Sequence, residues 1–489
     1  MNITGTPRIV LNVDGNTRYA TYTSGTGTAS LTFTYSPTVG DVDLDGITIS
    51  STSIDLNGGT IKDLVGNDLS PATFTAPNTT GVKVNYPSLS MDFVYDADGR
   101  YSVNGVVYDT FPTFLSAVSG TFTGGSGTFY NSSGNIQTGT VGTPRFEYDP
   151  TTLQPKGLLL EGYTVNYALR SADINLSPWV VSNGTITANI TTAPTGTAVA
   201  EKLVENAGTG DKEVSQAITV TNATVYTASI YAKAAERTQV RFRSSGGSSI
   251  FTLTGSGTAV SGGTDTASIQ QINSGWYRLA VKFISSSTSE TIAFALINGG
   301  VSSYAGDGTS GAYAWGAQLE IGQTPSSYIP TTTGTNNRAL DNFQIPTGTW
   351  FSNTNGLMQT KTSTNNPTFN TYVYDIVTDN SNYMSLYKTA SPISARFDVV
   401  NAGSTQASIL QSASIGNIDT CVTSYKANSF KISRNGAAIT SDTSGTAPSI
   451  TSFKIGQSRF GVNQLHGNMR YFKYYPTQPS DTQLQLLSQ

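Results

Sequence analysis

Residues 311–330, GAYAWGAQLEIGQTPSSYIP, constrain the fold more than any other stretch of the chain. Side chains alternate along 311–321, which is the period of two that predicts a β-strand. Pro325 and Pro330 follow, and because proline cannot donate to a strand ladder, this strand should close a compact unit. A matching start, KGLLLEGYTVNYALRS, lies at 156–171. The two stretches therefore bracket a middle module. One face of its last strand carries Tyr313, Trp315, Leu319 and Ile321.

The composition favours an all-β protein built of several domains. Charged residues make up only 12% of the 489 positions, whereas 49 Gly, 25 Tyr and 20 Phe are present. Disordered chains are poor in aromatic and β-branched residues, so this chain should bury cores. Thr, Val, Ile, Tyr and Phe favour strands, and Gly and Asn supply turns. We therefore expect several β-sandwich or jelly-roll domains in series.

Several protein classes are disfavoured. The net charge is −4 and no basic cluster stands out, so no nucleic-acid partner is expected. No apolar run reaches the roughly 20 residues of a membrane helix. The single cysteine, Cys421, excludes an internal disulfide framework. The first residues, MNITGTPRIVLNV, lack the pattern of a secretory signal. This combination suits a particle that is assembled in a bacterial cytoplasm and released by lysis.

Residues 1–86 alternate short strands with turn clusters, as β-sandwiches do. The stretches GDVDLDGITI (40–49) and LNGGTIKDLVGNDL (56–69) resemble bacterial immunoglobulin-like modules of surface adhesins. Three acidic residues before Gly46 are candidate Ca²⁺ ligands, but an EF-hand needs Glu at the twelfth loop position, where Thr52 stands. An acidic turn without metal is the favoured alternative. The candidate ligands are Asp41, Asp43 and Asp45.

Residues 87–155 are expected to form a small linking or attachment segment. Thr110 is placed to cap a short helix over 111–118. The following stretch, TPRFEYDPTTLQPKGLLLEGYTVNYALRS (143–171), resembles a segment that joins attachment regions to sugar-binding-like modules in tailed-bacteriophage structural proteins. Members of that group carry Arg-Thr-Asn where this chain has Thr164, Val165 and Asn166. The resemblance thus implies a different anchor at this position.

The middle module, 156–335, contains long alternating strands such as VYTASIYAKA (225–234) and GWYRLAVKFI (275–284). With WGAQLEIGQTPSSYIPT (315–331), they resemble the carbohydrate-binding-module-like jelly roll of phage structural proteins. Such sandwiches stack sugars on exposed aromatic rings. Trp276 and Arg278 lie on the face opposite the apolar stripe of their strand, and Trp179 lies near a loop. These three residues are the candidate glycan-binding set, although a packing role is the commoner fate of single aromatic residues.

Residues 336–489 contain further strands, including TYVYDIV (371–377) and NYMSLYK (382–388). The closing stretch, FKIGQSRFGVNQLHGNMRYFKYYP (453–476), resembles the last strands of concanavalin A-like, laminin-G-type sandwiches. Ser480 and Gln483 form the pattern of a capping box for a terminal helical turn. The acidic residues are scattered, so a calcium-free sandwich is expected here.

No catalytic residue emerges from the sequence. The sole histidine, His466, has no second histidine or cysteine pair with which to bind zinc. Its surroundings contain no nucleophile elbow. Concanavalin-like hydrolases place glutamates on one strand, whereas 336–489 contains no glutamate at all. No cofactor is expected other than the candidate Ca²⁺.

These observations predict a non-enzymatic structural protein of a tailed-bacteriophage virion: a head fibre, decoration protein or tail fibre. Its expected partners are capsid or tail proteins and, through weak binding, host surface polysaccharide; a homo-oligomer such as a trimer is expected. Two alternatives remain. A bacterial surface adhesin would carry a secretion signal or sorting tail, and a polysaccharide depolymerase would need a pair of carboxylates.

Overall fold

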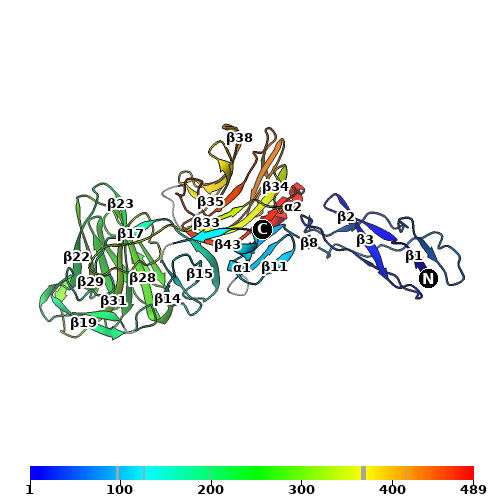
Figure 1. The fold of residues 1–489 in the computed structure, drawn as a ribbon. Coiled ribbons are helices and arrows are strands. Elements are labelled where there is room, and N and C mark those ends of the chain that lie inside the picture. Colours follow the sequence, from blue (N-terminus) through cyan, green and yellow to red (C-terminus); the bar gives the residue numbers. More distant parts are fainter. Residues whose placement is uncertain (95–98, 125–126, 198, 365–369, 415) are drawn as a thin grey trace.

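The computed structural model describes residues 1–489 except 95–98, 125–126, 198, 365–369 and 415. Strands dominate the described residues, with two short α-helices, α1 (Phe111–Ala117) and α2 (Asp481–Leu487). The all-β prediction is confirmed. No helix among the described residues is long and apolar enough to cross a membrane. Figure 1 shows two large sandwiches side by side and a slender N-terminal unit that projects from one of them.

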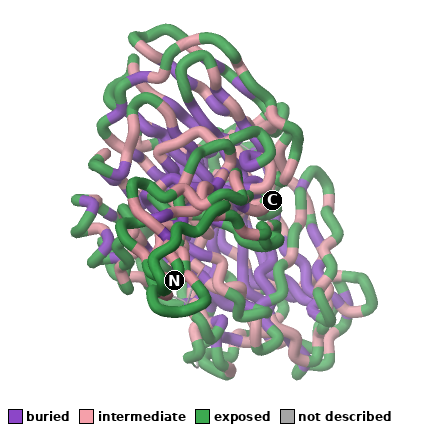
Figure 2. Tube along the Cα trace, turned by 90° about the vertical axis from the view of Figure 1, so that its right-hand side faces the viewer, coloured by how far each residue is buried: buried purple, intermediate pink, exposed green. Residues whose placement is uncertain are grey.

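The N-terminal unit has a small core, in which five buried residues pack between short strands. Figure 2 shows this unit as mostly exposed or intermediate, whereas the buried segments gather inside the large sandwiches. Its main sheet has the order β4 (Thr32–Thr34), β3 (Asn16–Ser24), β2 (Arg8–Val13) and β6 (Thr48–Ile49). Two strand pairs complete it, β1 (Asn2–Thr4) with β7 (Thr60–Lys62) and β5 (Val42–Asp43) with β8 (Val84–Asn85).

The second body is a sandwich of two large sheets. One sheet contains, in order, β11 (Val106–Tyr108), β10 (Arg100–Val103), β9 (Leu89–Asp92), β43 (Gly467–Tyr475), β34 (Asn355–Thr364), β39 (Ile418–Lys426), β40 (Ser429–Arg434) and β41 (Thr440–Asp442), with β15 (Arg145–Tyr148) and β16 (Pro155–Leu160) attached beside β43. The other contains β12 (Thr121–Thr123), β33 (Asn342–Pro346), β42 (Ser452–Ile455), β35 (Thr371–Asp379), β36 (Asn382–Lys388), β37 (Ser394–Asn401) and β38 (Ser404–Ser412).

The strands of this sandwich cross the domain boundaries that the sequence predicted. The 87–155 segment is not a separate linking unit, because its strands belong to the same sheets as those of 336–489. One edge of β43 pairs with β34, and the other is shared between β16 and β9. Thr110 caps α1 as predicted, and this helix buries Phe111 and Phe114 in a core that also contains Phe343 and Phe472. The C-terminal strands thus lack a complete core without the earlier segment.

The third body, in the range where we expected a jelly roll, consists of two six-stranded sheets and is inserted between β16 and β33; we keep the name jelly roll for it. One sheet has the order β18 (Val180–Ser182), β22 (Glu213–Thr219), β29 (Ser289–Ile297), β24 (Gln239–Ser244), β25 (Gly247–Thr252) and β26 (Thr258–Val260). The other has the order β19 (Gly184–Thr191), β20 (Ala200–Glu205), β31 (Gly311–Ile321), β23 (Val225–Ala234), β28 (Trp276–Ile284) and β27 (Thr266–Gln271). The chain enters and leaves through one antiparallel pair, β17 (Thr164–Asn166) with β32 (Asn336–Arg338). We call this pair the neck.

Helix α2 joins the N-terminal unit to the sandwich. Ser480 accepts from the backbone N–H of Gln483, but the reciprocal half of the expected capping box is absent. The side chain of Gln483 instead accepts from the backbone N–H of Leu44 at 2.7 Å and donates to Asp45 at 2.6 Å. The backbone N–H of Ser480 donates to Asp14 at 2.8 Å. The helix end therefore uses its polar groups to hold another domain.

Candidate functional site

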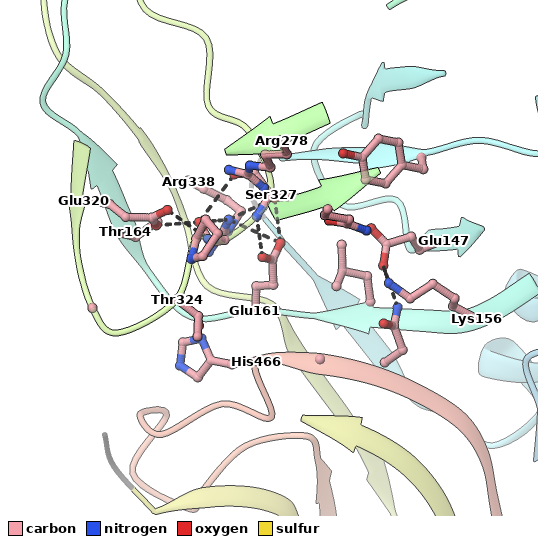
Figure 3. A pocket seen from close by; sticks show the side chains of 18 of the residues that line it. Glu147, Lys156, Glu161, Thr164, Arg278, Glu320, Thr324, Ser327, Arg338 and His466 are labelled. Carbon is pink, nitrogen blue, oxygen red and sulfur yellow. Dashed lines mark hydrogen bonds and ion pairs between the residues drawn. The ribbon is translucent and has the colours of Figure 1, made fainter. Parts of the chain in front are cut away.

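A polar cleft lies between the jelly roll and the sandwich, beside the neck. Its central cavity of about 140 Å³ shares Tyr163 and His466 with a neighbouring cavity of about 360 Å³. It shares Lys156 and Gln270 with a third cavity, of about 510 Å³. Figure 3 shows that side chains from both bodies converge on the central cavity. We call the three cavities together the inter-domain cleft.

Buried ions form the wall of the central cavity next to the neck. Glu161 accepts from Arg145 at 2.8 Å and from the Ser327 hydroxyl at 2.7 Å, and it forms an ion pair with Arg338 at 3.2 Å. Arg145 also pairs with Asp341 at 2.6 Å. All four charged side chains are at most 6% exposed, so water screens these pairs very little. The network fixes the orientation of the jelly roll on the sandwich.

The charge of Glu161 is fixed by these partners. Burial by itself would favour the neutral acid. Arg338 and Arg145, together with hydrogen bonds from Ser327, outweigh burial and hold the pKa of the Glu161 carboxyl well below its usual range. Glu161 is therefore a permanent carboxylate at neutral pH.

The other two glutamates of the cavity are also engaged by protein donors. Glu147 pairs with Lys156 at 2.8 Å and accepts from the Asn468 amide at 3.0 Å. Glu320 on β31 accepts from the backbone N–H of Ser326 at 2.8 Å and from its hydroxyl at 2.6 Å. These bonds orient the carboxylates within a pre-formed wall.

The mouth of the cleft presents an aromatic ring. Tyr163, between β16 and β17, lines both the central and the 360 Å³ cavities, and it is 61% exposed. His466 lies at the boundary of the same two cavities. Burial, with Arg338 nearby, lowers the pKa of His466 to about 4, so its imidazole is neutral at pH 7. The mouth thus combines an accessible ring with a neutral hydrogen-bonding group.

The structure does not bear out the two tryptophans as stacking platforms. Trp276 is 0% exposed, and its indole N–H donates to the carbonyl of Thr192 at 3.0 Å. Trp179 is 7% exposed and donates to the carbonyls of Leu169 and Arg170. Neither ring offers a free face to a sugar. Trp315 is 3% exposed and packs with Tyr313 in a smaller cluster, whereas Leu319 lies in the main jelly-roll core and Ile321 is 48% exposed, so these four residues do not share one face of the strand as predicted.

The burial of Trp276 has an identifiable cause. Trp276 does lie on the face of β28 opposite the apolar stripe, as predicted, since Tyr277 and Leu279 are in the main jelly-roll core. That second face packs in a separate cluster, to which the jelly roll contributes Ala193 and the sandwich segment contributes a covering hairpin, β13 (Thr128–Tyr130) with β14 (Ile136–Thr138). The covering hairpin lies far from Trp276 in sequence, so strand alternation could not reveal it.

Arg278, the third predicted residue, does line the central cavity. It lies two positions along β28 from Trp276 and is 8% exposed. Its guanidinium donates to the Ser229 hydroxyl at 3.1 Å and lies 5.3 Å from the ring centre of Tyr231. Of the predicted sugar-binding residues, Arg278 alone contributes to the cleft.

The acidic turn of the N-terminal unit directs its oxygens to protein donors. Asp41 accepts from Arg18, Tyr35 and Thr38, and Asp43 accepts from the backbone N–H groups of Asp14 and Gly46. Asp45 accepts from Gln483. Within the described part of the chain, no group of three or more acidic, histidine or cysteine side chains is placed to hold a metal.

Sequence reasoning missed most of the cleft. Tyr163, Glu161 and Lys156 lie within 156–171, where the sequence predicts only the start of the middle module, and Glu320 lies within the strand that closes the module. Thr164 stands where the proteins that this stretch resembles carry arginine, and it pairs across the neck with Arg338. The guanidinium of Arg338 binds Ser326, Ser327 and the carbonyl of Gly162. An arginine from the partner strand therefore anchors this segment.

Comparisons with known proteins give only distant structural similarities. No protein-family profile matches the chain, and no curated protein matches it. Domain 4 of the extracellular arabinanase AbnA from Geobacillus stearothermophilus shares 15% identity over 34% of this chain and 82% of that chain, with a TM-score of 0.26. The tandem CBM22 domains of Xyn10C from Paenibacillus barcinonensis share 10% identity over 65% of this chain and 95% of that chain, with a TM-score of 0.21. Domains LG4-5 of the mouse laminin alpha1 chain share 9% identity over 55% of this chain and 83% of that chain, with a TM-score of 0.20.

Proposed function

We propose that this chain is a non-enzymatic attachment protein of a tailed-bacteriophage particle, which binds host surface glycans through the inter-domain cleft. The phage assignment is supported by the resemblance of residues 143–171 and 315–331 to phage structural proteins. Its partners would be neighbouring capsid or tail proteins, and it would be made in the cytoplasm of the bacterial host. These parts of the proposal rest on the sequence.

The observation that carries the glycan-binding proposal is the cleft itself. Sugars present apolar ring faces and many hydroxyls, so a site for them needs an accessible aromatic ring beside oriented polar groups. Tyr163 supplies the accessible ring at the mouth. Gln270, Lys156 and Arg278 supply donors along the wall. Because the ion network holds both bodies in place, the cleft would be pre-formed, which lowers the ordering cost of binding.

The state of the cleft acids supports binding without cleavage. A glycosidase needs one carboxylic acid that remains protonated until it protonates the leaving group. Glu161 is held as a carboxylate by two arginines, which is the opposite state. Glu147 is paired with Lys156. The chemistry of the site therefore favours recognition.

Weak sites would suffice on a particle that carries many copies. Linked sites raise the total affinity without new contacts, provided that several can engage one surface together. A homo-oligomer, such as the trimer expected from the sequence, would add to this effect. In Figure 1 the N-terminal unit projects from the side of the sandwich that faces away from the jelly roll, so one end can dock while the cleft between the two bodies remains accessible.

A glycan array with the intact chain tests this function. We expect saturable binding to bacterial surface polysaccharides, and Tyr163→Ala should weaken it by up to about tenfold, since one aromatic contact contributes about 0.5–1.5 kcal/mol. Tyr19→Ala, in the N-terminal unit, is the matched control and should leave binding unchanged. Absence of binding to every glycan would contradict the proposal, and so would release of reducing ends.

The particle assignment requires a separate measurement. Peptide mass spectrometry of particles purified from a lysate should find this chain at a fixed copy number relative to the capsid or tail proteins. Recovery of the chain from the envelope of uninfected cells instead would favour the adhesin alternative.

A further inference from the structure

Arg278 is a buried cation without a carboxylate partner. Four arginines among the described residues are buried: Arg145, Arg241, Arg278 and Arg338. The other three pair with Asp or Glu side chains within 4 Å, whereas no such pair involves Arg278. Burying a charge is costly unless it is paired and hydrogen-bonded. The exception lies on the wall of the inter-domain cleft.

The hydrogen bonds of Arg278 are also incomplete. A guanidinium offers five N–H donors in a planar fork, and the Ser229 hydroxyl accepts from one of its terminal nitrogens. The Nε of Arg278 is buried and, like that of the other three buried arginines, has no acceptor among the described residues. The phenol ring of Tyr231, 5.3 Å from the guanidinium carbon, supplies a cation–π contact but no acceptor for these donors. Donor capacity therefore remains for a ligand in the cavity.

Two of the three glutamates around the cavity are paired with cations, and the third, Glu320, accepts from neutral donors. Glu161 faces Arg145 and Arg338, and Glu147 faces Lys156. Glu320 is held by Ser326 and by the Gln318 amide, which donates to it at 2.6 Å. Glu320 and Glu161 act on Arg278 only through longer-range attraction. His466 is neutral at pH 7 because its pKa is about 4.

We propose that the cleft selects an anionic saccharide, whose acidic group binds the guanidinium of Arg278. This inference rests on the proposed glycan binding and names the class of sugar. The planar fork of arginine matches the two oxygens of a carboxylate or phosphate, and such charge-assisted bonds are roughly twice as strong as neutral ones. A sugar acid would supply the missing charge partner, and the polar wall would bind the hydroxyls of its ring.

The test compares an acidic glycan with its neutral ester and with a glycan that carries a different acidic group. Binding of the intact chain to oligogalacturonate, to its methyl ester and to a phosphodiester-linked glycan would be measured by calorimetry. We expect an acidic ligand to bind about tenfold or more tightly than the neutral ester, as one charge-assisted contact provides. Comparing oligogalacturonate with the phosphodiester-linked glycan shows whether the cleft binds a carboxylate or a phosphate group.

Two substitutions assign the preference to Arg278. Arg278→Met should bring the ratio between acid and ester to about one, and Arg278→Lys should leave a reduced preference, because lysine keeps the charge but loses the fork. Arg243→Met removes a partly exposed arginine that pairs with Glu213 on the other sheet, and it should leave the ratio unchanged. If Arg278→Met fails to fold, the affinity ratio between acid and ester in the wild-type chain and in Arg278→Lys still shows whether Arg278 determines the preference.

The outcomes separate this inference from the proposed function. Equal binding of acid and ester through the cleft overturns the inference but leaves glycan binding intact. An acid preference that is undiminished in Arg278→Met, or in Arg278→Lys, also overturns it. Failure to bind any glycan, neutral or acidic, overturns both proposals.

Discussion

The Nη2 of Arg145 donates to Oδ2 of Asp341 at 2.6 Å, across 196 positions of the sequence. The pair links a strand that precedes the jelly roll to the segment that follows it. Asp341 also accepts from the backbone N–H of Glu161 at 2.8 Å, so one carboxylate holds together the chain segments that enter and leave the neck. The orientation of the cleft therefore depends on a few buried ions.

Removal of Asp341 should destabilise the chain strongly. Asp341→Ala leaves Arg145 buried with one partner fewer, and breaking a buried pair costs about 3–5 kcal/mol of unfolding free energy. Denaturant unfolding followed by tryptophan fluorescence measures this loss. Asp68→Ala breaks the exposed pair with Lys62, so it should change the free energy by less than about 1 kcal/mol. Equal effects of the two substitutions would contradict the assigned role of the network.

Phe114→Ala tests whether residues 87–160 and 336–489 form one domain. Phe114 is 0% exposed, and its ring packs against Tyr101 with centroids 5.4 Å apart. Deleting a buried phenylalanine costs about 3–5 kcal/mol. Hydrogen exchange should therefore show faster opening of β43 and β34, which lie far away in the sequence. If protection falls only within 87–155, that segment is an independent unit.

Gln483→Ala should loosen the N-terminal unit. The amide bridges Leu44 and Asp45, and the buried side chain is 2% exposed. Its loss leaves the Leu44 N–H without this acceptor, which typically costs about 1–3 kcal/mol. Small-angle scattering should show a broader range of dimensions. Gln485→Ala, whose amide bonds only the carbonyl of Ala437, is the control and should not change the scattering.

Glu201 predicts a pH dependence of stability. Burial raises the pKa of this carboxyl to about 7 in the folded chain, and Asp173 adds to the rise; one of its oxygens is buried without a partner. Its ordinary value is 4.5, so the folded state holds the proton more tightly than the unfolded state. Its contribution to stability is present below pH 4.5 and is lost as the pH rises through about 7. Glu201→Gln should thus raise the melting temperature at pH 8 and change it little at pH 4. The opposite pattern in a pair of melting curves would contradict this pKa.

The sequence predicted the strands better than their partners. Strand 225–234 was predicted at its observed bounds, and α1 begins after Thr110 as its cap requires. Both features are local, because they depend on alternation and on one hydroxyl. The pairing of β43 with β9 joins residues more than 370 positions apart, which no local pattern encodes.

The candidate site was predictable only for Arg278. The side-chain period placed Trp276 and Arg278 on the same face of β28, which is correct. Whether that face is open depends on β13 and β14, which cover Trp276 but leave Arg278 at the cavity. Tyr163 carries no local signal, because its exposure results from the gap between two bodies.

Hydroxyl-radical footprinting of the intact chain, with and without the glycan that binds best on the array, tests the central claim most directly. Tyr163 is oxidisable and 61% exposed, so the unbound chain should be modified there. The account predicts that bound glycan protects Tyr163, whereas Tyr19 in the N-terminal unit stays equally reactive. Protection elsewhere, with Tyr163 unchanged, would contradict the assignment of the inter-domain cleft as the glycan site.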